Sequence, residues 1–558
     1  MRHDYIVVGA GSSGAAIAAR LARQGRTVLL LEAGEPNEHH FWVRVPLGIA
    51  RILGDERYVW QFHTEPQRSL AGQTVYWPRG KLPGGSSSVN GMVFVRGDPA
   101  EYDAWRDSGL PGWGWDDVLP YFRRLESTTI GSAALRGRDG PIRVTSLARN
   151  PDALSDAFLA ACIDSGIPAT PDYNGPMYEG VSYLQLSTDN GRRVSTATGY
   201  LHAFRGEGLQ FETGATVLRV LFEGSRASGV EYLQGGVKHR AFANAEVLLC
   251  AGPVKSPQIL ELSGVGDASR LHRLGIDVTR HLPGVGENLV DHLQSRLTFE
   301  CKRAITLNET VASPWRKCLL GARYVFARTG LMATPACTVH ALARVHDDEW
   351  RPSVKIQLHH LSAGDRVELS ASGKGKSALD AYPGFSIGFF QLRPQSRGHV
   401  HAASADPHAL PTVDPRYLDD ETDRQTVVAA LRLARRVSRS PMLADFLKKE
   451  TRPGIDVDDE EGLLDYIRQS GATSFHPVGT CRMGHDAMAV VDERLRVQGL
   501  AGLRVVDSSV MPSLPASNTN AASIMIGEKA ADMVLQDEKC TTSATRSRSS
   551  SWATSSSV

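Results

Sequence analysis

The sequence predicts an α/β domain built on a parallel sheet, joined to an α+β domain with an antiparallel sheet. Residues 4–34 have the pattern of a buried strand, a glycine-rich turn, a helix and a second buried strand, which is typical of a parallel α/β sheet. Residues 310–470 differ, because short strand-like segments dominate there. These segments are residues 353–363, 384–394 and 398–407, and an amphipathic helix is predicted over residues 423–440.

The first element carries the motif G-x-G-x-x-G at Gly9, Gly11 and Gly14, followed by a helix over residues 15–23. The first glycine permits a tight turn, the second lets a pyrophosphate approach the backbone, and the third lets the helix pack against the strand. The helix start offers unpaired N–H groups to phosphates. This order of strand, glycines and helix predicts a Rossmann-like dinucleotide site.

An acidic residue, Glu32, ends the second strand of this unit. Its carboxylate can accept hydrogen bonds from the hydroxyls of an adenosine ribose. We expect Ser12, Ser13 and Ala33 to belong to the same dinucleotide-binding site. The later segments SGVGDAS and PGVGENL lack a third glycine, so the sequence predicts one dinucleotide, which would have to carry any redox group.

The composition limits the classes of function. The chain has 558 residues, of which 42% are hydrophobic and 22% are charged, as in an ordinary soluble enzyme. A net charge of +1 gives no sign of a nucleic-acid partner. Seven scattered cysteines, an odd number without a C-x-x-C pair, indicate neither a disulfide framework nor a zinc ribbon.

No stretch of the sequence looks like a membrane anchor or a leader. No apolar run approaches the ~20 residues that span a bilayer. No signal peptide precedes the strand that begins near residue 4. We therefore expect a cytoplasmic protein without a transmembrane segment, and peripheral contact with a membrane stays open.

A second glycine-rich segment, residues 77–105, contains Gly84, Gly85 and Asn90. Paired glycines let backbone lie against a flat ligand, and an asparagine amide both donates and accepts hydrogen bonds. By itself the segment would also suit a surface loop. The segment matches a known family pattern only together with four later parts of the sequence. These are residues 252–266, 282–292 and 503–534, and SFHPVGTCRMG at residues 474–484.

With these blocks the sequence resembles the glucose–methanol–choline (GMC) oxidoreductases, which are FAD enzymes that oxidise alcohols. The resemblance runs from about residue 3 to 537 and is closest to the bacterial alcohol and choline dehydrogenase branch. It implies a discontinuous FAD-binding domain over residues 1–310, with substrate-domain insertions, completed by residues 470–540. It implies a substrate-binding domain over residues 311–469. The serine- and threonine-rich residues 541–558 are expected to form a disordered tail.

The resemblance also implies which residues hold the FAD. Glu32 would bind the adenosine ribose, the backbone of Val217 the adenine, and Asp507 would lie beside the ribityl–pyrophosphate linkage. The residues expected along the flavin are Gly84, Gly85, Asn90, Gly91, Val93 and Asn520. Val89 stands where some relatives bond the flavin covalently through a histidine, so the FAD is predicted to be non-covalent.

Two other positions depart from the family pattern. Pro83 precedes the glycine pair, and because proline fixes φ and lacks an N–H, this loop is expected to differ locally. Thr338 stands where choline-handling relatives have a glutamate, whose charge would pair with a quaternary ammonium ion. The loss of that carboxylate argues against choline as the substrate.

The histidine of SFHPVGTCRMG, His476, admits three interpretations. A metal site would need a fitting ligand set, and His476, Cys481 and His485 lack a partner pair, so no metal is predicted. A structural role is the usual interpretation of a single loop histidine. The resemblance instead implies a general base, whose neutral imidazole takes the hydroxyl proton while the carbon releases hydride to flavin N5.

A second group should contact the alcohol oxygen, and the family places it after the strand that ends in VDSS. Here the segment SNTNAAS offers two asparagines. We expect Asn518 to bind the oxygen and Asn520 to lie nearer the flavin ring. Both residues also suit the cap of the following helix, and that role is compatible with the functional one.

The function implied by the resemblance is FAD-dependent oxidation of a primary alcohol to an aldehyde, with electrons passed to a quinone or another acceptor. The alternatives are an alcohol oxidase that uses O₂, a choline dehydrogenase, and an FAD-containing hydroxynitrile lyase of the same fold. The segment TGLMATPACTVHALA predicts an apolar pocket, which favours aliphatic or aromatic alcohols over sugars. The alcohol, the acceptor and the oligomeric state stay open.

Overall fold

The computed structural model describes residues 2–204, 206–364 and 379–553, with residues 541–553 described by their backbone alone. The predicted opening unit is present as strand β1 (Arg2–Val8), helix α1 (Ser12–Arg23) and strand β2 (Val28–Leu31). Tyr5 to Val8 and all of β2 are buried, which explains their unbroken apolar runs.

The first sheet has the order β12-β2-β1-β15-β14-β13, with β26 paired to β15. Its parallel part consists of β1, β2, β12 (Leu209–Glu212), β15 (Val237–Leu249) and β26 (Leu503–Val505). Strands β13 (Ala215–Glu223) and β14 (Arg226–Gln234) extend it in the antiparallel sense. The sheet therefore joins strands from three distant parts of the chain.

Helix α13 (Asn520–Ala553) closes this domain by packing against α1. The contact is close, because a Cβ added at Gly527 would lie 2.5 Å from the backbone oxygen of Ser13. The guanidinium of Arg20 also pairs with the buried carboxylate of Glu528 at 2.8 Å. The start of α13, where two asparagines were expected to act, is thereby fixed beside the glycine-rich turn.

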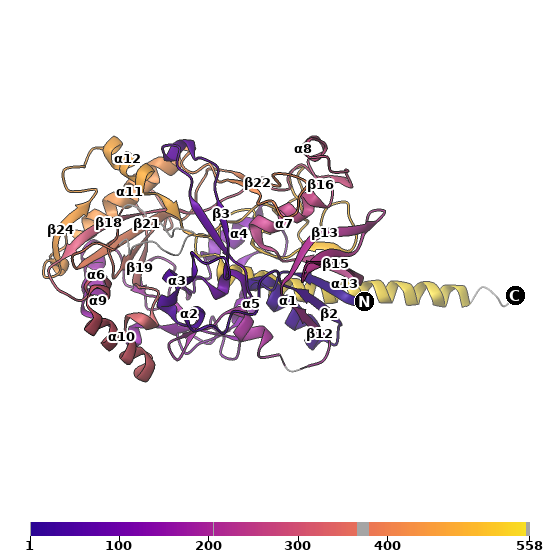
Figure 1. Cartoon of the computed structure of the whole chain (residues 1–558), viewed down its shortest axis with the longest axis horizontal. Helices are drawn as coiled ribbons and strands as arrows, with labels where there is room; N and C mark the ends of the chain where they lie inside the picture. The colour runs from indigo at the N-terminus through magenta and orange to yellow at the C-terminus, as the bar shows by residue number, and fades with distance from the viewer. Residues whose placement is uncertain (1, 205, 365–378, 554–558) are drawn as a thin grey trace.

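The second sheet has the order β24-β18-β21-β20-β19-β8, with β25 paired to β18, and every pairing in it is antiparallel. Its strands are β8 (Gly180–Tyr183), β18 (Leu293–Cys301), β19 (Cys337–Ala343), β20 (Val354–His359), β21 (Gly384–Gln391), β24 (Leu447–Arg452) and β25 (Ala472–Thr473). Helix α11 (Glu421–Ser438) packs on β21 and β20. Figure 1 shows this sheet at the end of the molecule away from β2 and β12.

The predicted combination of an α/β domain with a second, antiparallel-sheet domain is thus confirmed. Strands β8 and β18 belong to the second sheet although they lie within residues 1–310, where insertions were expected. The predicted tail begins within α13, which runs to Ala553, and its last residues, 554–558, lie outside the described residues. Among the described residues, no helix combines the length and apolar character that crossing a membrane requires.

Candidate active site

Two cavities adjoin along a shared wall. Predicted cofactor residues line the first cavity: Gly9, Gly11, Ser12, Ser13, Glu32, Ala33, Gly85, Val217 and Asp507. Other predicted residues line the second: Asn90, Gly91, Val93, His476, Asn518 and Asn520. The side chains common to both walls are Ser12, Arg79, Ser86, Ser508 and Ser523. A long ligand could therefore occupy both spaces at once.

The glycine-rich turn fits a dinucleotide at the first cavity. A Cβ added at Gly11 would meet nothing nearer than the Cys250 backbone oxygen, at 4.0 Å, so this position faces open space. At Gly14 a Cβ would lie 1.9 Å from the backbone oxygen of Gly9. Gly11 therefore leaves room for a ligand, whereas Gly14, which does not line the cavity, leaves room for the helix to pack against the strand.

Glu32 lies at the wall of the first cavity with both carboxylate oxygens held by backbone. One oxygen accepts from the N–H of Ala10 and the other from the N–H of Gly34, each at 2.9 Å. Burial raises the pKa of Glu32 to about 7. Each carboxylate oxygen can accept more than one hydrogen bond, so the group can still receive hydroxyl donors from a ribose.

Asp507 lies between two loops that border the first cavity. Its carboxylate accepts hydrogen bonds from the N–H of Gly252 at 2.9 Å, the hydroxyl of Ser256 at 2.6 Å and the N–H of Ser509 at 2.8 Å. Gly252 and Ser256 belong to the start of helix α7 (Gly252–Leu262). The carboxylate therefore fixes this helix start against the strand end, in addition to any contact with a ligand.

The glycine pair does not lie as the sequence predicts. Gly85 reaches the first cavity, but Gly84 lines neither cavity. A Cβ at Gly84, whose φ is 87°, would lie 2.3 Å from the hydroxyl oxygen of Ser88, so this glycine serves the internal packing of the loop. The hydroxyl of Ser88 donates to the carbonyl of Pro83 at 2.7 Å, which uses the proline's remaining polar group.

The backbone around His476 points its ring into the second cavity. Phe475 has φ 65°, a left-handed conformation that is rare for a bulky residue. Its carbonyl accepts a hydrogen bond from the Arg79 guanidinium at 3.0 Å. The N–H of His476 donates to the buried carboxylate of Asp291 at 2.7 Å. These contacts hold a strained turn that aims the imidazole.

A chain of hydrogen bonds determines the tautomer of His476. His292 Nε2 must donate to the Leu392 carbonyl at 3.0 Å, because a carbonyl only accepts. Its Nδ1 therefore accepts from Nδ1 of His476, at 3.0 Å, when both rings are neutral. The Nε2 of His476 is left with a lone pair at the cavity wall. Nothing in the sequence singles out His292 for this role.

The same chain continues beyond the imidazole. Nδ2 of Asn518 lies 2.8 Å from Nε2 of His476, and Oδ1 of Asn518 accepts from the Lys355 ammonium at 3.0 Å. Because an ammonium group only donates, the amide must present its N–H to the histidine. The Leu392 carbonyl at one end of the chain can only accept, and the Lys355 ammonium at the other end can only donate. Together they fix the direction of every hydrogen bond between them.

The electrostatics of this chain favour a neutral imidazole. Burial, and then the nearby His292, Lys355 and Arg79, hold the pKa of His476 well below its usual range. Burial lowers the pKa of His292 to about 4 and that of Lys355 to about 8. The histidine therefore keeps its lone pair across the neutral pH range, as a proton acceptor requires.

The structure corrects the expected apolar pocket. Apolar residues such as Ile49, Leu53 and Val89 line one part of the second cavity, but the sheet supplies Gln294, Arg296, Gln357 and His359. The signal was present in the sequence as polar residues at every second position of β18 and β20. Residues at every second position of a strand lie on one face of the sheet, and in β18 and β20 this polar face lines the cavity.

Thr338 does not line the second cavity, contrary to the expectation from its place in the family pattern. An irregularity in the pairing of β19 with β20 lies between Cys337 and His340, and Cys337 lines the cavity instead. The hydroxyl of Thr338 bonds the hydroxyl of Ser155 at 2.6 Å and lies 3.1 Å from Nε2 of His360. The side chain at position 338 therefore faces away from the second cavity.

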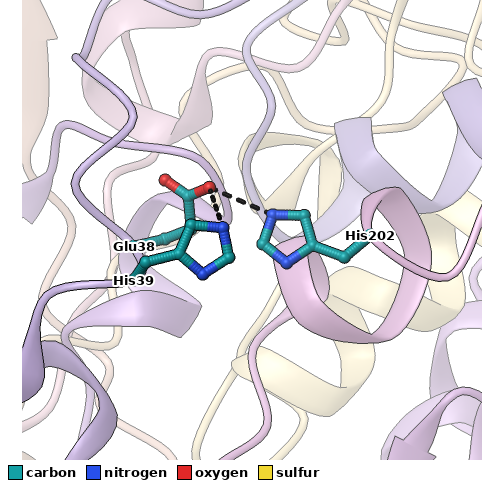
Figure 2. Close-up of side chains that lie close together, drawn as sticks. All are labelled: Glu38, His39 and His202. Atoms are coloured by element: carbon teal, nitrogen blue, oxygen red, sulfur yellow. Dashed lines mark hydrogen bonds and ion pairs between the residues drawn. The ribbon is translucent and has the colours of Figure 1, made fainter.

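Another group of titratable side chains lies away from both cavities. Figure 2 shows the stacked imidazoles of His39 and His202 beside one carboxylate oxygen of Glu38, at 3.4 and 3.0 Å from their Nε2 atoms. Such a cluster resembles a ligand set, as does that of Glu287, His399 and His401. Ion pairs and hydrogen bonds already account for both groups. The absence of a metal stays a prediction.

Comparison with known proteins identifies one family. Two family models described as GMC oxidoreductase match residues 3–294 and 394–527. The oxygen-dependent choline dehydrogenase of Photobacterium profundum is 39% identical over 540 residues, covering 96% of this chain and 93% of that protein. The mitochondrial choline dehydrogenase of Homo sapiens is 40% identical over 542 residues, covering 95% and 89%. The crystal structure of pyridoxine 4-oxidase from Mesorbium loti has a TM-score of 0.85 and 31% identity, covering 95% and 98%.

Proposed function

The chain belongs to the GMC oxidoreductase family and is an FAD-dependent oxidoreductase, and on this basis we propose that it oxidises a primary alcohol to an aldehyde. The observation that supports the proposal is the hydrogen-bond chain that keeps Nε2 of His476 an unprotonated acceptor at the wall of the second cavity, where it accepts from the Asn518 amide. Bound FAD would supply the hydride acceptor.

In the proposed reaction His476 acts as the general base. An alcohol hydroxyl that enters the second cavity takes the place of the Asn518 N–H at Nε2 and donates its proton there, while the released amide N–H donates to the alcohol oxygen. The imidazolium that forms keeps its Nδ1–H bond to His292. The Lys355 ammonium donates to Oδ1 of Asn518 and so holds the amide in place. As a nearby cation it also stabilises the negative charge of the alkoxide. Deprotonation of the oxygen is what makes hydride loss from the carbon easy.

The proposal is tested by mixing the oxidised holoenzyme anaerobically with a panel of primary alcohols and recording the flavin absorbance. Bleaching by an alcohol is expected, with formation of the aldehyde. A quinone is expected to restore the absorbance faster than air does; the reverse order would instead support an oxidase. Failure of every alcohol to bleach the flavin, together with cleavage of a cyanohydrin, would support the lyase alternative.

The identity of the relatives makes choline the second candidate substrate, since two of them are named choline dehydrogenases. The charges at the second cavity argue against it. Arg79 and Arg296 line this cavity, and no aspartate or glutamate among the described residues does. A quaternary ammonium ion would meet cations there without a compensating carboxylate. Choline is therefore expected to reduce the flavin more slowly than neutral primary alcohols.

The attachment of the cofactor gives a simple prediction. Val89, which lines the second cavity, offers no nucleophilic side chain where some relatives are expected to bond the flavin. We predict that acid precipitation of the holoenzyme releases the FAD into the supernatant, leaving a colourless pellet. Absorbance of both fractions measures this release. A yellow pellet after repeated washing would contradict a non-covalent cofactor.

A lipid-soluble quinone acceptor would be reached at a membrane surface, and helix α10 (Pro314–Ala327) has a surface suited to membrane contact. Figure 1 shows α10 at the periphery of the molecule. Trp315, Leu319 and Phe326 form one exposed stripe, 75%, 60% and 87% accessible, opposite the buried Tyr324. The helix also carries Arg316, Lys317 and Arg323 and no acidic residue. This combination is typical of a helix that lies on an anionic membrane.

We predict that the holoenzyme floats with vesicles that contain anionic phospholipid and does not float with purely zwitterionic vesicles. Trp315→Ser is expected to reduce the bound fraction several-fold, since an interfacial tryptophan contributes both apolar area and anchoring. Trp350→Ser is the matched control, because Trp350 is equally exposed, at 75%, but lies outside α10. Equal loss of flotation in the two variants would contradict a specific role for α10.

A further inference from the structure

The second sheet presents a polar row to the second cavity. Arg296 of β18 pairs with Gly388 of β21, which in turn pairs with Gln357 of β20. Side chains of directly paired residues in antiparallel strands lie on the same face of the sheet. A Cβ at Gly388 would lie 2.9 Å from Nε2 of His359, so the glycine leaves room for the His359 imidazole on this face. Arg296, Gln357 and His359 all line the cavity.

The guanidinium of Arg296 differs from the other deeply placed arginines. Arg96 and Arg136 both pair with the buried carboxylate of Glu126, at 2.5 and 2.8 Å. Arg296 makes no side-chain hydrogen bond or ion pair within the parts of the chain that the structure describes, and only its backbone carbonyl accepts, from the hydroxyl of Tyr466. Burial lowers the pKa of Arg296, as expected for a cation without a counter-ion.

The wider surroundings of Arg296 are also basic. Arg79 shares the cavity, and the Lys355 ammonium contacts the Asn518 amide at the same wall. Asp291, a buried acid that contacts the catalytic segment, accepts from the N–H of His476 and the hydroxyls of Thr473 and Tyr417 and does not line the cavity. A ligand that complements this wall carries negative charge.

Building on the proposed alcohol oxidation, we propose that the natural substrate is a hydroxycarboxylate. Its carboxylate pairs with the Arg296 guanidinium, with the Gln357 and Gln294 amides beside it, while its hydroxyl reaches His476 and Asn518. The substrate thus spans the cavity from the sheet face to the base.

The chemistry of arginine supports a carboxylate in particular. The guanidinium presents parallel N–H donors that match the two oxygens of a carboxylate in a bidentate pair. Such a pair at one end of the substrate fixes the direction of the carbinol at the other end, which raises the fraction of productive complexes. The same positively charged wall disfavours a cationic alcohol, so it both binds the anionic substrate and discriminates against cationic ones.

The kinetic test compares ω-hydroxycarboxylates of graded chain length with their methyl esters, which keep the shape and lose the charge. With the wild-type holoenzyme, kcat/KM for flavin reduction by the best acid is expected to exceed that for its ester on the order of 10²-fold. Arg296→Gln is expected to remove this preference, because kcat/KM for the acid should fall far more than kcat/KM for the ester. Lys302→Gln, which removes an exposed cation beyond the end of β18, is the charge-matched control and should keep the preference.

A binding test avoids any dependence on turnover. The carboxylate without the hydroxyl group is titrated into oxidised holoenzyme, and the shift of the visible flavin spectrum or the heat of binding gives Kd. Arg296→Gln is expected to weaken this binding on the order of 10²-fold. Arg296→Lys is expected to weaken it less, because lysine keeps the charge but lacks the parallel N–H donors of the guanidinium. Unfolding temperature measured on each variant separates a binding effect from a folding effect.

The outcomes distinguish this inference from the proposed function. Equal kcat/KM for acid and ester in the wild type, or an unchanged preference in Arg296→Gln, would overturn the carboxylate site while leaving alcohol oxidation intact. A hydroxyalkyl phosphate that outperforms every hydroxycarboxylate would overturn the choice of anion. If no alcohol bleaches the flavin, the proposed oxidation fails, and loss of carboxylate binding in Arg296→Gln still decides whether Arg296 forms an anion site.

Discussion

Replacement of His476 by alanine is expected to slow reduction of the bound flavin by alcohol on the order of 10²–10⁴-fold, the usual contribution of a general base. The variant removes the unprotonated nitrogen that the hydrogen-bond chain holds next to the Asn518 amide, so the hydroxyl proton loses the base placed for it. Rapid mixing of enzyme and alcohol without oxygen, followed by flavin absorbance, measures the step directly.

Two controls separate the loss of a base from a disturbed fold. His485→Ala removes the 58% exposed histidine that directly follows the segment SFHPVGTCRMG, and this variant should reduce the flavin at the wild-type rate. Added imidazole should restore part of the rate in His476→Ala, since a small base can enter the space left by the side chain. Near-normal reduction in His476→Ala without imidazole would overturn the assignment of the base.

The pH dependence follows from the lowered pKa of His476. A base works in its deprotonated form, which is present above its pKa, and the pKa of His476 lies well below the usual 6.5. The rate of flavin reduction should therefore stay level as the pH falls through 6.5 and decline only in more acidic solution. A half-maximal rate near pH 6.5 would contradict the electrostatics of the buried chain.

Substitution of Gly11 by alanine is expected to weaken FAD binding on the order of 10²-fold, about 2.7 kcal/mol, while leaving the apoprotein as stable as the wild type. The new methyl group would enter open space at the first cavity, where the nearest protein atom is the Cys250 backbone oxygen at 4.0 Å. The backbone of Gly11, with φ −76° and ψ −158°, is extended and accepts alanine without strain.

The neighbouring Gly14→Ala serves as a matched contrast. Its methyl group would lie 1.9 Å from the backbone oxygen of Gly9, so the helix must move and the apoprotein should unfold at a lower temperature. Quenching of FAD fluorescence on titration gives Kd, and thermal unfolding of the apoprotein gives stability. Wild-type affinity in Gly11→Ala, or lost stability in that variant with full affinity in Gly14→Ala, would reverse the roles given to the two glycines.

The sequence by itself determined the fold class and the nucleotide-binding unit. Residues 4–34 predict a strand, turn, helix and strand, and the structure contains β1, α1 and β2 there. These features are local, because glycine positions and apolar runs constrain the backbone within a few residues of themselves. The family resemblance added His476 and Asn518, which the structure brings to within 2.8 Å of each other.

Only the tertiary structure revealed the partners of these residues and the character of the pocket. His292, Lys355 and Arg296 lie on segments far from His476 in sequence, and their faces depend on how β18, β20 and β21 pair. The irregularity beside Thr338 shows why sequence reasoning failed there. A shift of one residue in strand pairing turns every later side chain to the opposite face, and long-range pairing alone sets that register.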